Sequence, residues 1–180
     1  MGWRSRKSWS DRFVPEIKSI LGTVLIDVAE TGDDALRNTD LITLTMRSGL
    51  RIACRVRRHP YLAAHGDEFT IRCSVVSGRE TEIDKVLAGW GDYLFYGFAN
   101  AAETALAAWF VGDLKVFREW FASYRRTFQD WPGEIRRNHD GSSKFLVFGI
   151  YDMDRRFVLA RKEPRLPALV QERSRPEEAA

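Results

Sequence analysis

Residues 40–57, DLITLTMRSGLRIACRVR, contain the pattern that decides the fold. Two runs with strand-like composition, residues 41–46 and 51–57, are separated by a short turn that contains Gly49. Apolar, β-branched runs joined by a glycine-containing turn are typical of an antiparallel hairpin. We therefore expect a β-hairpin here, with Asp40 directly before its first strand.

The rest of the chain alternates helical and strand-like patterns. Helices are expected from residue 10 or 11 to Gly22, from a cap at Thr81 to residue 90, and from a cap at Asp113 to residue 124. Strands are expected over residues 23–29, 69–75 (as the third strand of an antiparallel meander), 93–98, 105–111, 144–151 and 157–160. The predicted fold class is α/β (α+β), with a mixed central sheet flanked by helices.

The length and composition predict one globular domain with two tails. The chain has 180 residues, of which 44% are hydrophobic, enough for a full-sized core. We expect a basic arm over residues 1–9, mobile in isolation, a single domain over residues 10–162, and an extended, disordered tail over residues 163–180.

The basic residues are mostly arginine. Of the 28 basic residues 22 are arginine, although the net charge is only +3. The guanidinium group binds phosphate through two parallel hydrogen bonds and stacks on aromatic rings, so the bias favours a polyanionic partner. A GC-rich coding sequence would give the same bias, and composition alone does not separate the two interpretations.

Two further features concern the cellular location. Cys54 and Cys73 fall on apolar faces of predicted strands, which favours buried, reduced thiols. The N-terminal residues have no apolar core typical of a secretory signal, and no apolar run approaches the length of a membrane span. We therefore expect a cytoplasmic protein that does not contact a membrane.

The order of these elements resembles the PD-(D/E)XK nuclease superfamily, and more narrowly proteins of this type encoded by phages and bacterial genomes. The matching stretches are residues 38–42, 51–57, 69–72, 81–85 and 89–93. The resemblance implies a restriction-endonuclease-like core. It also implies a site in which an aspartate at the head of one strand, here Asp40, and an acid-x-lysine on the next strand hold Mg²⁺ or Mn²⁺ at a phosphodiester.

The chain departs from that pattern at the second strand. Arg55 and Arg57 stand where the family has the acid and the lysine. Two guanidiniums near a divalent ion would repel it by a few kcal/mol each, at an effective dielectric constant of about 20. The same side chains suit a phosphate group, either for recognition or for stabilising a transition state. The alternative interpretation is an amphipathic strand with a solvated basic face.

Some superfamily members carry the second acid on the following helix, and Glu82 is the best candidate for that role. Together with Asp40 it would form the metal site, while Lys85 would orient a water and Arg57 would lie near the phosphate. The alternatives are a turn-forming role for Asp40 and a capping-box or exposed ion-pair role for Glu82.

Three functional hypotheses follow. The first is a Mg²⁺- or Mn²⁺-dependent nuclease with the catalytic residues Asp40, Glu82, Lys85 and Arg57. The second is a catalytically silent relative that binds nucleic acid, DNA rather than RNA, through Arg51, Arg55, Arg57 and Arg72. The third is a protein-interaction module. The sequence leaves the oligomeric state open, with a homodimer among the alternatives.

Overall fold

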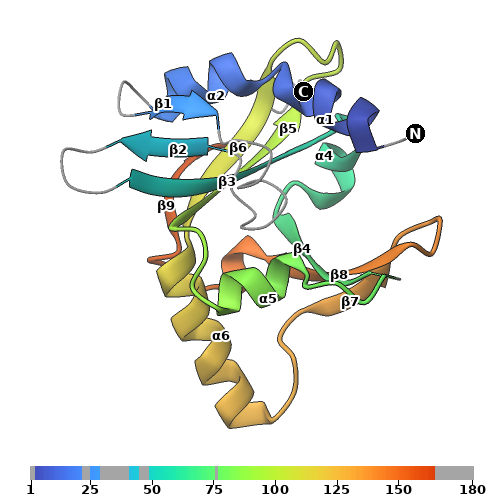
Figure 1. Ribbon diagram of the computed structural model, residues 1–180, viewed down its shortest axis with the longest axis vertical. Coiled ribbons are helices and arrows are strands. Elements are labelled where there is room, and N and C mark those ends of the chain that lie inside the picture. Colours follow the sequence, from blue (N-terminus) through green and yellow to red (C-terminus); the bar gives the residue numbers. More distant parts are fainter. Residues whose placement is uncertain (1–2, 22–24, 29–40, 45–48, 76, 165–180) are drawn as a thin grey trace, which may run out of the picture.

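The computed structural model describes residues 3–21, 25–28, 41–44, 49–75 and 77–164. The strands are β1 (Leu25–Val28), β2 (Leu41–Leu44), β3 (Gly49–Arg57), β4 (Glu68–Val75), β5 (Tyr93–Ala99), β6 (Leu106–Asp113), β7 (Glu134–Arg137), β8 (Ser143–Gly149) and β9 (Val158–Lys162). The helices are α1 (Trp3–Asp11), α2 (Val14–Leu21), α4 (Pro60–His65), α5 (Glu82–Leu87) and α6 (Leu114–Phe128), with a short 3₁₀ helix, η1 (Ile150–Asp152). Figure 1 shows α1 and α2 on one side of the larger sheet, and the smaller sheet with α5 on the other.

The larger sheet is mixed and has the strand order β1-β2-β3-β5-β6-β9. Strands β2 and β3 are antiparallel, with Leu41 opposite Ile52, which confirms the hairpin predicted around Gly49. Strands β3 and β5 are parallel, whereas β5 and β6 are antiparallel. Because parallel neighbours need a long crossover, the chain leaves the sheet after β3 and returns at β5 by way of α4, β4 and α5.

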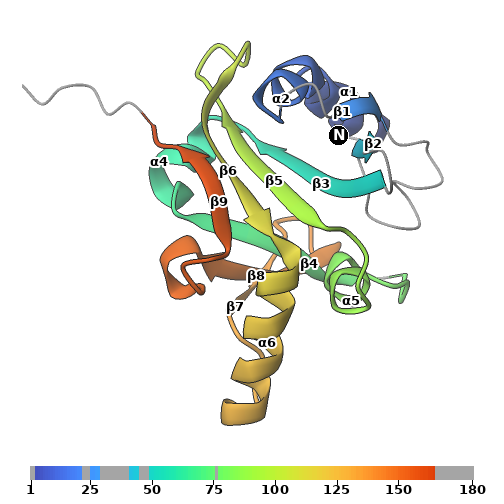
Figure 2. The same cartoon turned by 90° about the vertical axis from the view of Figure 1, so that its left-hand side faces the viewer.

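The smaller sheet is antiparallel and has the order β4-β8-β7. The strand predicted over residues 69–75 is present, but its predicted place in a meander with β3 is wrong, because β4 pairs with β8. Helix α4, which begins at Pro60, turns the chain away from the larger sheet between β3 and β4 (Figure 2). The pairing places Phe69 opposite Phe148, whose rings stack at 5.2 Å.

The N-terminal segment is helical, which differs from the arm predicted over residues 1–9. The indole ring of Trp9 packs edge-on against Phe13, with the ring centroids 5.2 Å apart. Its Nε1 donates a hydrogen bond of 2.6 Å to Glu103, in the turn between β5 and β6. Phe13 and Ile17 are buried against the larger sheet, so α1 and α2 belong to the folded domain.

The two predicted helix caps lie where the sequence places them. Asp113 accepts hydrogen bonds from the backbone N–H of Lys115 (2.7 Å) and Val116 (3.2 Å), which starts α6. Thr81 and Asp84 form a capping box at the start of α5, so the capping acid is Asp84 and not Glu82.

Aromatic side chains fill the space between the two sheets. The ring of Phe69 lies 5.3 Å from that of Phe157, 5.7 Å from that of Phe110 and 6.1 Å from that of Phe117. Phe69, Phe117 and Phe157 are fully buried. A second apolar cluster lies on the other face of the larger sheet, under α1 and α2. The first cluster packs the larger sheet against β4, and the second packs it against α1 and α2.

The predicted fold class is confirmed at the level of a mixed α/β protein with a mixed sheet and flanking helices. The restriction-endonuclease-like core stays a prediction. Among the described residues, no helix is long and apolar enough to cross a membrane. Most of the predicted C-terminal tail, residues 165–180, lies outside the described residues.

Candidate functional site

Strand β3 presents arginines on one face and apolar side chains on the other, as its alternation predicts. Ile52 is buried in the cluster under α2, and Cys54 and Val56 pack against the same cluster. Arg51, Arg55 and Arg57 occupy the opposite face, and Arg72 of β4 joins them through its contact with Glu82. We call these four residues, Arg51, Arg55, Arg57 and Arg72, the arginine face.

Arg55 lies at the seam between the two sheets. Its Nη1 donates to the backbone oxygen and to the Oγ1 of Thr70 on β4, both at 3.4 Å. Its Nη2 is ion-paired with Oε1 of Glu82. The side chain is only 20% exposed, so the alternative interpretation of a fully solvated basic strand does not hold at Arg55.

Arg72 approaches the same carboxylate from the smaller sheet. Its backbone N–H donates to Oε2 of Glu82 at 3.0 Å, and its Nη2 lies 3.8 Å from Oε1. The Nε of Arg72 is buried and has no hydrogen-bond partner within the described part of the chain. Its side chain as a whole is 42% exposed, whereas that of Arg55 is 20% exposed.

Glu82 is therefore a shared counter-ion. Burial alone would raise the pKa of its carboxyl group, but the positive charges of Arg55 and Arg72 and the hydrogen bonds from both residues outweigh burial and hold that pKa below its usual value. Both carboxylate oxygens already have arginine donors. The side chain is 16% exposed.

Lys85, which we predicted to orient a water, lies on the buried side of α5 and is 8% exposed. It is three residues from Glu82, so the two side chains leave neighbouring positions of one short helix. The structure thus brings Glu82, Arg55 and Arg72 together in direct contact, and places Lys85 on the same helix.

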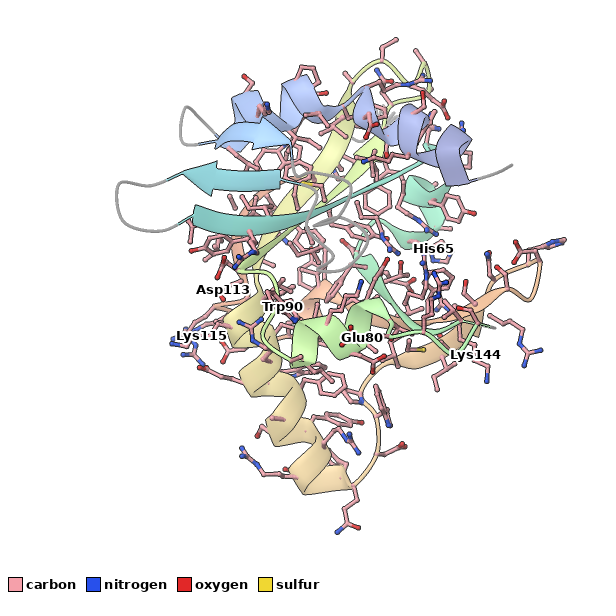
Figure 3. All side chains as sticks on the ribbon, in the orientation of Figure 1. His65, Glu80, Trp90, Asp113, Lys115 and Lys144 are labelled. Atoms are coloured by element: carbon pink, nitrogen blue, oxygen red, sulfur yellow. The ribbon has the colours of Figure 1, made fainter. Side chains whose placement is uncertain are left out.

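The outer arginines of β3 lie over aromatic rings. The guanidinium carbon of Arg57 is 4.3 Å from the centre of the Tyr61 ring on α4. That of Arg51 is 5.6 Å from the ring of Trp90, which follows α5 (Figure 3). Arg55 and Arg72 share a third ring, Phe145 of β8, each at 5.9 Å. Such contacts hold the planar cations in defined positions.

Sequence reasoning missed these three rings as site residues. Trp90 was expected only as the last residue of a helix, Phe145 was expected only as part of a strand, and Tyr61 falls in a segment for which no helix was predicted. The rings come together at the arginine face only in the folded protein, because each lies in a different segment of the chain. No local sequence pattern marks them. The alternation of arginines in β3 was the only part of the pattern visible in one stretch of sequence.

The predicted metal site is only partly visible. Asp40 lies outside the described residues, and Glu82 is held by Arg55 and Arg72. No group of three or more His, Cys, Asp or Glu side chains suitable for a metal ion occurs within the described ranges. A hard divalent ion needs carboxylate oxygens that are free to coordinate it. Oε1 of Glu82 is paired with the guanidinium groups of Arg55 and Arg72, and Oε2 accepts the backbone N–H of Arg72. The metal-ligand role of Glu82 therefore stays a prediction, and we derive no reaction step through a metal ion.

Comparison of the chain with models of known protein families and with curated proteins found no match.

Proposed function

We propose that the protein binds nucleic acid through the arginine face, with Glu82 as the internal counter-ion of Arg55 and Arg72. The observation that carries this proposal is the convergence of two guanidiniums from different sheets on one carboxylate and one ring, Phe145. Cations fixed in this way lose less conformational freedom when they bind phosphate, because their side chains are already ordered.

The charge balance of this region supports the same conclusion. Glu82 neutralises part of the charge of Arg55 and Arg72, whereas Arg51 and Arg57 lie over neutral rings. An ordered row of cations with excess positive charge is a suitable surface for a phosphate backbone. The arginine bias of the composition agrees with this proposal, but the proposal depends on the positions of the arginine side chains.

The contacts of Glu82 favour nucleic-acid binding over hydrolysis. Metal-dependent cleavage requires carboxylates that hold an ion and activate a water. In the described part of the chain, the acid predicted for that task is used to neutralise arginines. The nuclease hypothesis stays a prediction.

The experiment is a binding titration with fluorescein-labelled DNA and RNA at low salt. The variant Arg51→Ala/Arg57→Ala removes two cations whose aromatic partners are neutral, and so leaves the partly buried ion pair of Arg55 with Glu82 intact. Its matched control is Arg126→Ala/Arg155→Ala, which removes the same charge from exposed positions on α6 and before β9. We expect the first variant to bind at least tenfold more weakly than the control. Equal affinities would contradict the proposed interface.

A further inference from the structure

Three rings lie along the arginine face, and each comes from a different segment of the chain. Tyr61 belongs to α4, Trp90 follows α5, and Phe145 belongs to β8. Each has at least one guanidinium of the arginine face within 6 Å of its ring centre. The arrangement is therefore a row of paired cations and aromatic rings.

The row runs along β3, because three of its cations belong to that strand. Arg51 and Arg57 are six residues apart on β3, which corresponds to about 20 Å at the usual rise of a strand. Tyr61 lies near the C-terminal end of this strand, over Arg57, and Trp90 lies nearer its start, over Arg51. The row is thus long enough to contact several consecutive nucleotides.

The rings remain accessible. Tyr61 is 44% exposed, although it is a large aromatic side chain, and Trp90 and Phe145 are half-buried. Rings that served only as core would be covered like Phe69, which is fully buried. Exposed rings beside fixed cations offer flat surfaces to a partner that carries both negative charge and planar groups.

The two nucleic-acid forms differ in what they present to such a surface. In a duplex each base is covered on both faces by its neighbours, so the protein contacts phosphates and groove edges. In a single strand the faces of the bases are free and stack on aromatic rings and on guanidinium planes. A row that alternates cations with accessible rings therefore suits the single strand better than the duplex.

We propose that the arginine face binds single-stranded nucleic acid in preference to duplex, with phosphates at the guanidiniums and unpaired bases against Tyr61 and Trp90. This inference rests on the proposed function and narrows its substrate class. Single-stranded DNA and single-stranded RNA both present free base faces and phosphates. Both are therefore candidates for the same site.

The test is a competition experiment with labelled oligothymidylate of about 16 nucleotides, a length within the usual range for one binding module. The unlabelled competitors are the same oligothymidylate, oligouridylate of equal length, and the duplex of oligothymidylate with oligoadenylate. We expect either single strand to compete about tenfold better than the duplex.

Three variants at two tyrosines test whether base stacking occurs at Tyr61. Tyr61→Ala should weaken single-strand binding about tenfold, because one stacking partner is lost. It should weaken duplex binding much less, because there only the support of Arg57 is lost. Tyr151→Ala is the matched control: Tyr151 is 65% exposed and Arg161 lies 5.4 Å from its ring, but it belongs to η1, outside the arginine face. Tyr61→Leu keeps apolar bulk on α4 without a ring, and should behave like Tyr61→Ala if stacking is the cause.

The outcomes separate this inference from the proposed function. The single-strand preference would be overturned if duplex and single strand competed equally. If binding were still reduced in Arg51→Ala/Arg57→Ala, the proposal of nucleic-acid binding would stand. Tyr61→Ala and Tyr151→Ala binding alike would also overturn it. No binding of any of the three oligonucleotides would overturn both proposals.

Discussion

Arg55 of β3 and Glu82 of α5 are ion-paired across the seam between the two sheets, and Arg72 of β4 binds the same carboxylate. The pair replaces the arrangement expected from the resemblance, in which an acid on a strand would bind a metal ion. Glu82, the acid predicted as a metal ligand, contacts the guanidinium groups of both arginines.

Replacing Glu82 by glutamine should strengthen nucleic-acid binding. The amide keeps the size of the side chain and the hydrogen bond from the N–H of Arg72, but it removes the negative charge that opposes phosphate. At low salt one charge a few ångströms from a phosphate is worth about fivefold in affinity. Titration of labelled DNA with wild type and Glu82→Gln checks this, and weaker binding by the variant would indicate that Glu82 assists binding directly.

The same carboxylate should make stability depend on pH. Its pKa is lower in the folded protein than in the unfolded chain, so ionised Glu82 stabilises the fold at pH values above about 4.3, the ordinary value. That contribution is lost as the pH falls through the folded-state pKa. Urea unfolding between neutral and acid pH should therefore show a steeper loss for wild type than for Glu82→Gln. Parallel curves would mean that the pairing with Arg55 and Arg72 contributes little.

The metal hypothesis makes a separate prediction. A nuclease with Asp40 and Glu82 as ligands would cleave DNA or RNA weakly with Mg²⁺ or Mn²⁺, and would lose that activity in both Asp40→Ala and Glu82→Ala. Because Arg55 and Arg72 engage Glu82, we expect labelled DNA and RNA to remain intact with either metal. Cleavage that disappears in both variants would restore the nuclease hypothesis.

The approach of Gly112 to Phe157 should make the core sensitive to a single methyl group. A Cβ at Gly112 would lie 2.5 Å from the Cζ of Phe157, a ring that is fully buried among other aromatic side chains. We expect Gly112→Ala to destabilise the protein by about 1–3 kcal/mol, the usual cost of overpacking. Chemical denaturation measures this. Gly141→Ala is an unsuitable control because of its positive φ of 70°, so Ala122→Gly on the exposed side of α6 is used, with an expected cost of about 1 kcal/mol.

Local patterns in the sequence predicted most of the individual elements. The hairpin around Gly49 and the caps at Thr81 and Asp113 depend on residues close together in the chain, and each was found. The partner of β4 was not predictable in this way, because Phe69 meets Phe148 only after folding. Strand β7 is four residues long and mostly polar, so no apolar run marks it.

Only the part of the candidate site that lies on a single strand, β3, was predictable from the sequence. Alternation placed Arg51, Arg55 and Arg57 on a common face. The pairing of Arg55 with Glu82 joins residues 27 positions apart, and the rings of Tyr61, Trp90 and Phe145 come from three further elements. A single sequence contains no local signal for such contacts. Asp40, the residue that first suggested a nuclease, lies outside the described residues.

The salt dependence of nucleic-acid binding tests most directly whether the arginine face is the interface. Each phosphate contact contributes about 0.7 to 0.9 to the slope of log affinity against log salt concentration. If the arginine face binds the phosphate backbone, Arg51→Ala/Arg57→Ala should lower the magnitude of that slope by about 1.4 to 1.8, while Arg126→Ala/Arg155→Ala should keep the wild-type slope. An unchanged slope in the first variant, or an equal decrease in both, would contradict the assignment of the interface to β3 and β4.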